Sequence, residues 1–391
     1  MKLKNLKESA VVCAVLFAFA SCSNDAVIEQ VSNEPTNALI SYSVNVPAAG
    51  RAATVYSSTV IPSQFYVWST FTPSGDNPQT QAYFNCDLVS TNTDEANKGI
   101  GTHYWPTDAG TLNFYALGGF DPDNNNWAWG DDFVPSYTYS NATSDVDLLY
   151  AVTTDKKRIA DPTNEYVNIN FRHAMAQIAF KFEVQNPNMY VEVSAIEVRN
   201  TYQDGTFKFP AESTTTQYLA GDKESFNTGE WSFPDTKTYK TDTVEVDKEL
   251  TYYNPENTTA KLGAVSCNDI LLLTPASYQA WEGAKEIGET DTYFAIKCKI
   301  YNSLDGLNKN VLIWDNTNSK NETQYVLVPA NFDWTMGRRY TYTFIFGNGN
   351  GGYDSNTPEN QVLFPIQYIW SCDDWVEVDP QGVNVNPTSE E

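Results

Sequence analysis

The chain contains an alternating run, Ile40-Ser41-Tyr42-Ser43-Val44-Asn45-Val46-Pro47, which sets the pattern for the rest of the sequence. Its apolar side chains recur at every second position, so a β-strand here would bury one face and expose the other. The proline lacks a backbone N–H and ends the run. Similar alternating runs recur along the chain, whereas no long segment has helical spacing. The sequence therefore predicts an all-β fold.

The same spacing predicts a series of further strands. They are expected at 64–72, 111–117, 147–153, 190–198, 269–273, 293–301, 310–314, 325–328, 340–346, 362–370 and 375–378. Residues 167–184 fit either one long strand or two strands joined at Arg172 and His173. We expect two tandem antiparallel β-sandwiches, an N-terminal domain over 38–187 with its first strand at 39–46, and a C-terminal domain over 188–391.

Composition suits a β-rich protein and argues against nucleic-acid binding. Of the 391 residues, 24 are basic and 49 are acidic, which gives a formal net charge of −25. A chain this acidic repels a polyanion, so nucleic acid is not an expected partner. Aromatic residues make up 14% of the chain, and aromatic side chains are enriched in strands.

The N-terminus resembles the signal peptide of a bacterial lipoprotein. Three lysines lie within the first seven residues, and residues 10–20 form an apolar run too short to span a bilayer. Two small residues then precede Cys22, as in a lipobox, although Phe19 stands where leucine is usual. The resemblance implies removal of residues 1–21, palmitate-bearing lipid on Cys22 and a flexible tether over 22–37. An ordinary secretory signal with a chance cysteine is the alternative.

A set of short motifs runs in order along the whole chain. They are YWP at 104–106, LNFYA at 112–116, DLLYA at 147–151, INFRHAM at 169–175, LLLTP at 271–275, WTMGRRYTYT at 334–343 and Trp375. Together they resemble the fimbrillin family, the subunits of type V pili. The resemblance implies transthyretin-like sandwich domains, a structural role in adhesion at the cell surface rather than an enzyme activity, and no cofactor.

The resemblance also implies a maturation step. Fimbrillin precursors reach the outer membrane as lipoproteins, and a trypsin-like protease then cuts after an arginine beyond the first strand. The matching residue here is Arg51, the only arginine before Arg158, so the new N-terminus would be Ala52. Cleavage would free the strand that carries the apolar residues Ile40, Tyr42, Val44 and Val46. On sequence alone, Arg51 also fits a solvated loop.

A strand from a neighbouring subunit, usually its C-terminal segment, would then fill the groove. The candidate donor in this chain is 376–386, whose apolar residues are Val376, Val378, Val383 and Val385. The run Val383-Asn384-Val385 echoes Val44-Asn45-Val46 of the first strand. An ordinary last strand with a frayed tail is the alternative.

Other candidate sites carry weaker signals. His103 and His173 are the only histidines and lack acids at metal-ligand spacing, so structural roles and no metal site are expected. Trp127 and Trp129 either stack on sugars or cover a sandwich edge. No nucleophile, base and orienting group can be assembled from local spacing, so no catalytic residue is predicted.

The sequence leaves open whether the chain forms a disulfide and whether it carries an O-glycan. Cys86, Cys267, Cys298 and Cys372 fit buried free thiols or one disulfide in an exported protein. Asp242-Thr243-Val244 matches a short O-glycan acceptor pattern.

The functional alternatives are a monomeric surface glycan-binding lipoprotein, or a tip or anchor subunit of a fimbria. The expected partners are other fimbrial subunits, the maturation protease, the outer membrane and a host or bacterial surface ligand.

Overall fold

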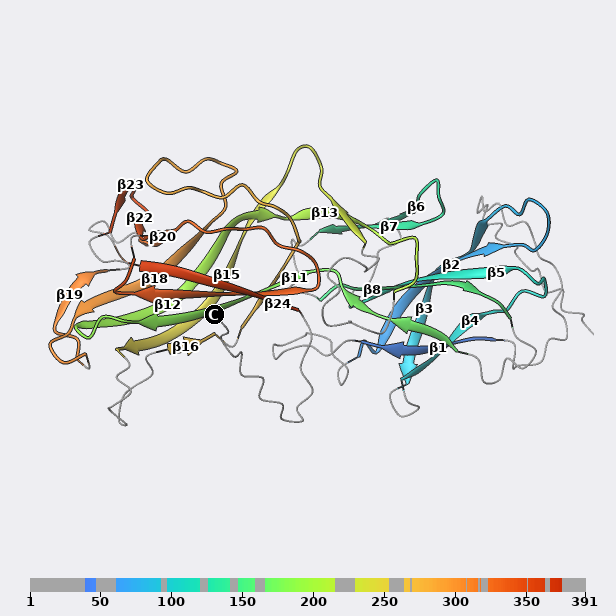
Figure 1. Ribbon diagram of the computed structural model, residues 1–391, viewed down its shortest axis with the longest axis horizontal. Helices are drawn as coiled ribbons and strands as arrows, with labels where there is room; N and C mark the ends of the chain where they lie inside the picture. The colour runs from blue at the N-terminus through green and yellow to red at the C-terminus, as the bar shows by residue number, and fades with distance from the viewer. Residues whose placement is uncertain are drawn as a thin grey trace, which may run out of the picture. The chain divides into compact units, whose positions relative to one another are not determined.

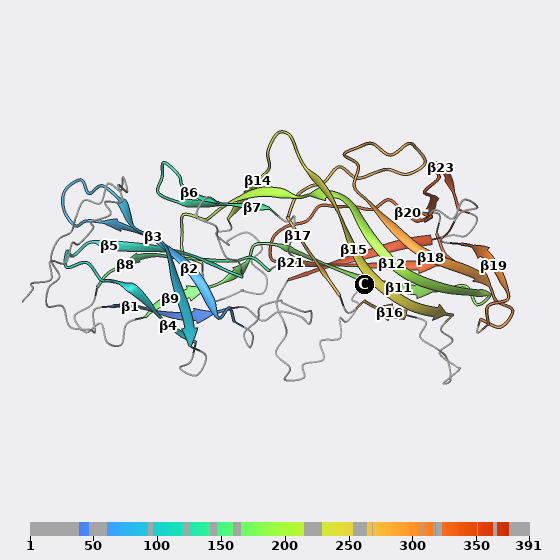
Figure 2. The ribbon, with the colours of Figure 1, turned by 180° about the vertical axis from the view of Figure 1, so that it is seen from behind.

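The protein is built from β-strands. The computed structural model describes residues 39–46, 61–92, 97–119, 126–140, 147–158, 166–214, 229–252, 264–267, 269–306, 308–315, 317, 323–349, 351–362 and 366–374. Within these ranges it contains 24 strands and no helix (Figure 1 and Figure 2). Nothing in the same ranges is a helix with the length and apolar character needed to cross a membrane. The all-β prediction is confirmed.

Eight strands from the first half of the chain form one curled sheet, in the order β10-β8-β5-β2-β3-β4-β1-β9. Their bounds are β1 Leu39–Asn45, β2 Gln64–Thr72, β3 Gln81–Asn92, β4 Lys98–Tyr104, β5 Thr111–Gly118, β8 Leu149–Lys156, β9 Val167–Asn170 and β10 Arg172–His173. Side chains of β1 and β9 share a buried cluster with those of β2 and β5, although these strands lie apart in the order. The sheet therefore folds over to enclose one core.

A four-stranded sheet, in the order β14-β13-β7-β6, covers the opposite face of β2, β5 and β8. Its strands are β6 Trp127–Trp129, β7 Pro135–Ser140, β13 Asp204–Lys208 and β14 Glu230–Ser232. Tyr137 and Phe207 of this sheet pack with Trp68 of β2 and Tyr150 of β8 in a second buried cluster. Because side chains alternate along a strand, β2 and β8 contribute to both clusters from their two faces.

Two further sheets enclose the core of the second half. One has the order β16-β11-β21-β24 with β17 paired to β11, and the other has the order β15-β12-β18-β20-β22-β23 with β19 paired to β18. Their strands are β11 Ala176–Val184, β12 Met189–Tyr202, β15 Tyr239–Thr251, β16 Ala264–Ser266, β17 Leu271–Leu273, β18 Tyr293–Asn302, β19 Val311–Trp314, β20 Val326–Val328, β21 Arg338–Phe346, β22 Tyr353–Asp354, β23 Thr357–Gln361 and β24 Ile366–Asp374. Phe180 and Phe344 from the first sheet meet Val191 and Phe294 from the second in one cluster, so the two sheets pack face to face.

Two pairings depart from the expected antiparallel pattern. Strand β1 pairs in parallel with β9, and β11 pairs in parallel with β21. The partners are far apart in sequence, and a parallel pair needs such a long crossover connection. Alternation of apolar residues does not report strand direction, so the sequence could not show this.

The run 167–184 forms three strands rather than one or two. Phe171 lies between β9 and β10, and its N–H donates to the carbonyl of Asn45 at 2.8 Å. The pairing partners then change between β10, in the eight-stranded sheet, and β11, in a sheet of the second half. The chain therefore enters the sheets of the second half at β11, one strand before the predicted boundary at 187–188. The turn at that boundary joins β11 to β12, which both belong to the second half. The division into two independent domains stays a prediction.

Candidate functional site

Strand β1, which the family resemblance predicts to be removable, lies inside the curled sheet between β4 and β9 (Figure 2). It pairs antiparallel with β4 and parallel with β9. Backbone hydrogen bonds hold both sides: the Val44 N–H donates to the Asn97 carbonyl at 3.0 Å, and the Asn45 carbonyl accepts from the Phe171 N–H at 2.8 Å. Loss of β1 would thus expose the hydrogen-bonding edges of two strands at once.

The apolar face of β1 fills part of the enclosed core. Ile40 and Tyr42 are 0% exposed, Val44 is 1% exposed and Val46, just after the strand, is 5% exposed. The intervening residues of the strand are half-buried or exposed. Burial of four such side chains contributes roughly 6–12 kcal/mol, at about 1.5–3 kcal/mol each. The strand is therefore held by its own burial and pairing, wherever the chain is cut beyond it.

Tyr42 makes the most specific contacts of the strand. Its ring packs edge-to-face against Phe65 at 5.9 Å and Phe114 at 6.1 Å between centroids. Its buried hydroxyl has no hydrogen-bond partner among the described residues. Burial, and secondarily the carboxylate of Asp87, raises the pKa of Tyr42 well above the usual value for a phenol. The hydroxyl therefore remains protonated in the folded protein.

Two glycines on β4 allow the neighbouring side chains to approach closely. A Cβ on Gly101 would lie 3.0 Å from a ring carbon of Tyr42, and a Cβ on Gly99 would lie 2.6 Å from a methyl group of Val89. Sequence reasoning missed both glycines, as well as Phe65 and Phe114. These residues come from strands distant in sequence, and no local pattern marks them as lining the β1 site.

Several predicted site residues lie outside the described residues. They are Cys22, Arg51, Ala52, Val376, Val378, Val383 and Val385. The structure does describe the strand that precedes the candidate donor. This strand, β24, ends at Asp374 and lies at the end of its sheet, where it pairs with β21. The candidate donor therefore begins directly after an edge strand.

Trp127 and Trp129 are both half-buried and pack against protein groups. The ring of Trp127 meets Trp68 at 5.7 Å, and Trp129 meets Tyr115 at 6.2 Å. The indole N–H of Trp129 donates to the side-chain oxygen of Asn85 at 2.8 Å. These contacts favour the prediction that the two indoles cover an edge of the sandwich.

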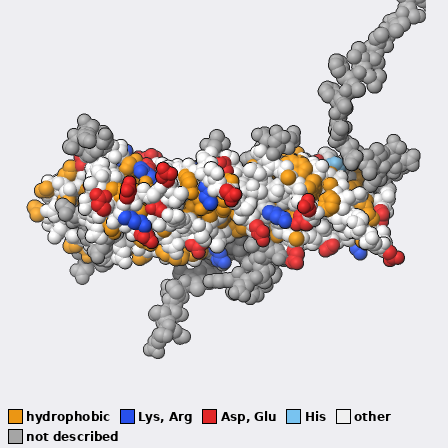
Figure 3. Space-filling model, turned by 90° about the horizontal axis from the view of Figure 1, so that it is seen from above, with side chains coloured by type: hydrophobic (Ala, Val, Ile, Leu, Met, Phe, Trp, Pro, Cys, Tyr) orange, Lys and Arg blue, Asp and Glu red, His pale blue; other side chains and the backbone are white. Residues whose placement is uncertain are grey.

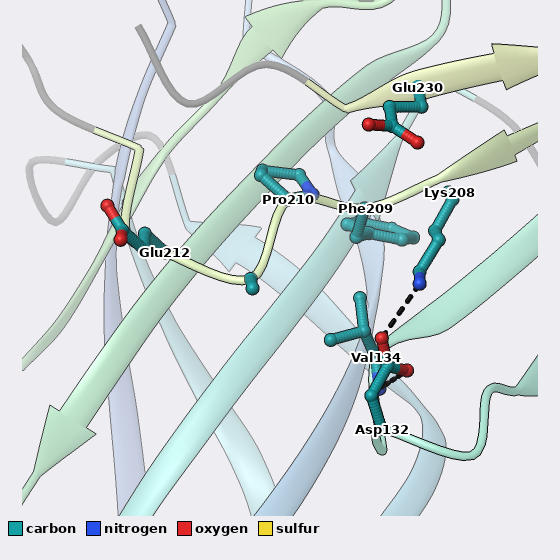
Figure 4. Close-up of a pocket in the computed structure, with 8 residues that line it drawn as sticks. Asp132, Val134, Lys208, Phe209, Pro210, Glu212 and Glu230 are labelled. Carbon is teal, nitrogen blue, oxygen red and sulfur yellow. Dashed lines mark hydrogen bonds and ion pairs between the residues drawn. The ribbon is translucent and has the colours of Figure 1, made fainter. Parts of the chain in front are cut away.

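A surface pocket of about 280 Å³ lies where β13, β14 and the loop before β7 meet (Figure 4). Lys208 and Asp132 form an ion pair inside it, with 2.7 Å between Nζ and Oδ2. This contact lowers the pKa of Asp132 and raises the pKa of Lys208. The carboxylates of Glu212 and Glu230 also line the pocket, while Phe209 is buried beneath it. Among the described residues that line the pocket, none offers an exposed aromatic face on which a sugar would stack.

The two histidines have separate surroundings. His103 stacks on Phe84 with 4.2 Å between ring centroids, and His173 lies buried with its Nδ1 2.9 Å from an oxygen of Asp147. Within the described part of the chain, no group of three or more His, Cys, Asp or Glu residues is arranged to hold a metal ion.

Three of the cysteines that could form a disulfide differ in burial. Cys298 is buried, Cys267 is half-buried and Cys372 is exposed on β24, and all three are free thiols. Burial raises the pKa of Cys267 to about 11, so its thiol is protonated at neutral pH. Of the O-glycan acceptor pattern, Thr243 is exposed in β15, while Asp242 accepts hydrogen bonds from Thr201 and Lys240.

A comparison with known protein families identifies the chain. The model of one family, described as fimbrillin-like, matches residues 63–360. The chain belongs to the fimbrillin-like family. The match begins after β1 and Arg51 and ends before β24, so it covers neither the candidate removable strand nor the candidate donor. No curated protein sequence matches this fimbrillin-like chain.

Several solved structures resemble it at low sequence identity. A candidate cell adhesion protein from Parabacteroides distasonis is 11% identical, with 88% of this chain and 98% of that chain covered and a TM-score of 0.43. A candidate cell adhesion protein from Bacteroides ovatus is 14% identical, with 87% and 99% covered and a TM-score of 0.40. The tip fimbrial protein Mfa3 from Porphyromonas gingivalis, truncated at its C-terminus, is 10% identical, with 86% and 99% covered and a TM-score of 0.35.

Proposed function

We propose that this fimbrillin-like protein is a structural subunit of a type V pilus that polymerises by exchange of its first strand. The observation that carries the proposal is the setting of β1. This strand is the first one described, it lies between two other strands, and its four apolar side chains fill a closed core. A cut beyond it would leave a strand held only by noncovalent contacts.

The energetics favour replacement of β1 over an empty groove. Loss of roughly 6–12 kcal/mol of burial is comparable to the whole stability of a typical domain, about 5–15 kcal/mol. The groove would also expose the edges of β4 and β9, which attract any free strand. A strand from another subunit restores both the hydrogen bonds and the burial, which is the physics of β-strand addition.

The proposed donor is the segment 376–386. It follows β24, which is the last strand of its sheet. Its valines form two alternating pairs, 376 with 378 and 383 with 385. Each pair can place two apolar side chains in a groove, whereas the alternative of a frayed tail predicts no role in assembly.

Export as a lipoprotein would place the precursor at the outer membrane before assembly. Lipid on Cys22 would hold it at the cell surface until a trypsin-like protease releases the mature chain at Ala52. The mature subunit would then join a fimbrium that supports adhesion to a host or bacterial surface. Cys22→Ala tests the anchor, because a variant that still fractionates with membranes and carries undiminished lipid would contradict it.

Substitution of Arg51 tests the mechanism. Arg51→Ala should accumulate as an uncut lipoprotein monomer, whereas Arg158→Ala, which changes the next arginine along the chain, should mature and polymerise normally. The readout is the molecular mass and polymer content of surface protein. Normal polymers from Arg51→Ala would refute cleavage at this site. An uncut wild-type chain at the base of fimbriae would instead identify an anchor subunit.

The alternative function is a monomeric surface lipoprotein that binds glycans, and the packing of Trp127 and Trp129 against protein groups weighs against it. Saturable oligosaccharide binding by an unprocessed monomer, lost in Trp129→Ala, would favour this alternative over the fimbrial subunit. A tip subunit would be cut at Arg51 but would need no donor strand.

A further inference from the structure

A row of aromatic rings crosses the core behind β1, and Tyr42 is its centre. The row consists of Trp105, Phe114, Tyr42, Phe65 and Phe171. Successive centroids are 6.1, 6.1, 5.9 and 5.7 Å apart, with interplanar angles of 75° to 87°. All five side chains are buried, so each ring edge meets the face of its neighbour in a dry interior.

Only the central ring of this row belongs to β1. Phe65 and Phe114 lie on β2 and β5, and the two outer rings follow β4 and β9. Loss of β1 would therefore leave Phe65 and Phe114 in place with a ring-sized gap between them. Each edge-to-face pair contributes about 0.5–1.5 kcal/mol beyond simple burial, and loss of Tyr42 removes two such pairs.

Gly101 shapes the same position from the side of β4. A Cβ there would lie 3.0 Å from the Tyr42 ring and 3.3 Å from its hydroxyl oxygen. The absence of a side chain on Gly101 thus leaves room for a six-membered ring beside β4. An aliphatic residue in place of Tyr42 would leave this space partly empty.

We propose that the groove left by β1 selects donor strands that place an aromatic side chain at the Tyr42 position, and that Gly101 sets this selectivity. The inference rests on the proposed strand exchange. The fitting partner is an extended strand with an aliphatic residue, then an aromatic residue, then two aliphatic residues, all at alternate positions. Phenylalanine fits better than tyrosine, because the buried hydroxyl of Tyr42 has no described hydrogen-bond partner.

The tail of this chain does not meet that requirement. Residues 376–391 contain no aromatic residue, and Trp375 lies eight positions before Val383 instead of two positions before an aliphatic pair. A second copy of this chain would therefore leave the gap between Phe65 and Phe114 unfilled. The preferred donor is the tail of a different subunit that carries an aromatic residue, so this groove favours a mixed fimbria.

Peptide binding to the cleaved protein tests this selectivity. The full chain is cut after Arg51, and an excess of each labelled peptide is incubated with it until exchange with the retained β1 reaches equilibrium, which is followed by fluorescence anisotropy. The probes are residues 38–47 as they stand, the same peptide with Tyr42→Phe, the same peptide with Tyr42→Val, and residues 376–386. We expect the Phe peptide to bind at least as tightly as the parent. The Val peptide and the tail peptide should bind about tenfold or more weakly, because a large side chain is lost from the core.

A matched pair of protein variants tests whether Gly101 sets the preference for an aromatic side chain. Gly101→Ala should weaken the Tyr and Phe peptides more than the Val peptide, because its Cβ would lie 3.0 Å from the aromatic ring in addition to 3.3 Å from the Ile40 carbonyl oxygen that all the β1 peptides share. Ile100→Ala, at an exposed position on the same strand, should affect all probes alike. Equal binding of the Val and Tyr peptides to the parent protein overturns the selectivity but not strand exchange. This comparison needs no protein variant, so it holds even if Gly101→Ala fails to fold. Failure of every peptide to bind overturns strand exchange itself, and the selectivity with it.

Discussion

At the scale of a residue, Tyr42 combines a structural role with an unsatisfied polar group. Its ring completes an aromatic row, while its hydroxyl lies in an apolar core with no hydrogen-bond partner among the described residues. A buried hydroxyl without a partner costs about 1–3 kcal/mol. Strand β1 is thus held by burial but carries an unfavourable buried hydroxyl at its centre, which is compatible with the proposed exchange of the strand.

Tyr42→Phe should stabilise the uncut protein, by about 1 kcal/mol at neutral pH, because it removes the unsatisfied hydroxyl. The advantage should grow in alkali. The pKa of Tyr42 is raised in the folded protein, so the phenol is protonated in both the folded and the unfolded state below about pH 10. Above that pH the unfolded phenol loses its proton and the folded one does not, so stability falls as pH rises.

The measurement is the free energy of unfolding between pH 8 and pH 11. The advantage of Tyr42→Phe should be constant up to about pH 10 and then increase by about 1.4 kcal/mol per pH unit. Tyr104→Phe, which changes an exposed phenol on β4, is the matched control. Parallel curves for Tyr42→Phe and the parent above pH 10 would show that the Tyr42 hydroxyl is not buried as described.

At the scale of an element, the proposed donor follows the edge strand β24. Truncation after Trp375 should leave a folded subunit that is still cut at Arg51 and still accepts a donor but cannot provide one. Mixed with cleaved parent subunits, it should cap growing chains and shorten polymers. Polymers of normal length made from truncated subunits alone would place the donor elsewhere.

Point substitutions in the tail refine this test. Val383→Asp and Val385→Asp should weaken polymers without unfolding the monomer, because each would place a charge in an apolar groove at a cost of several kcal/mol. Asn384→Asp, between them on the polar face of the expected strand, should leave polymers intact. Equal effects from all three variants, measured as polymer length by electron microscopy, would argue against a donor with this alternation.

Strands were predictable from the sequence where one face is buried and the other exposed. Strand β1 shows this alternation and lies within one residue of its expected ends. Strands β2 and β18 also lie within one residue of their expected ends, although both of their faces are buried over part of their length. Strand β15 was missed because it lies at the end of its sheet, where only a few of its thirteen residues, such as Val244 and Val246, face the core. Strand β3 was missed because Cys86, with a φ of 50°, interrupts its alternation.

The candidate site was predictable only in part, for the same physical reason. The apolar face of β1 could be identified because Ile40, Tyr42, Val44 and Val46 recur at every second position, and all four are buried. The groove that receives them could not be predicted, since Phe65, Phe114 and Gly101 come from three other strands. Local alternation shows which residues face inward, but not which strands they meet.

At the scale of the whole molecule, surface charge suits an exposed assembly. The net charge is −25, and acidic side chains are interspersed with basic and apolar ones on the face drawn in Figure 3. Such a charge keeps separate chains soluble and opposes nonspecific association. Assembly of so acidic a subunit would therefore need a specific contact, and the proposed exchange of β1 for a donor strand would supply one.

The N-terminal sequence of polymeric protein recovered from the cell surface shows whether β1 leaves the subunit on assembly. If β1 is exchanged, subunits within the polymer begin at Ala52 and lack residues 38–51, so β1 is absent and its groove holds a donor strand. Polymers whose subunits retain residues 38–51 would contradict this exchange, because β1 would still occupy the groove and the subunits would have to be joined in another way.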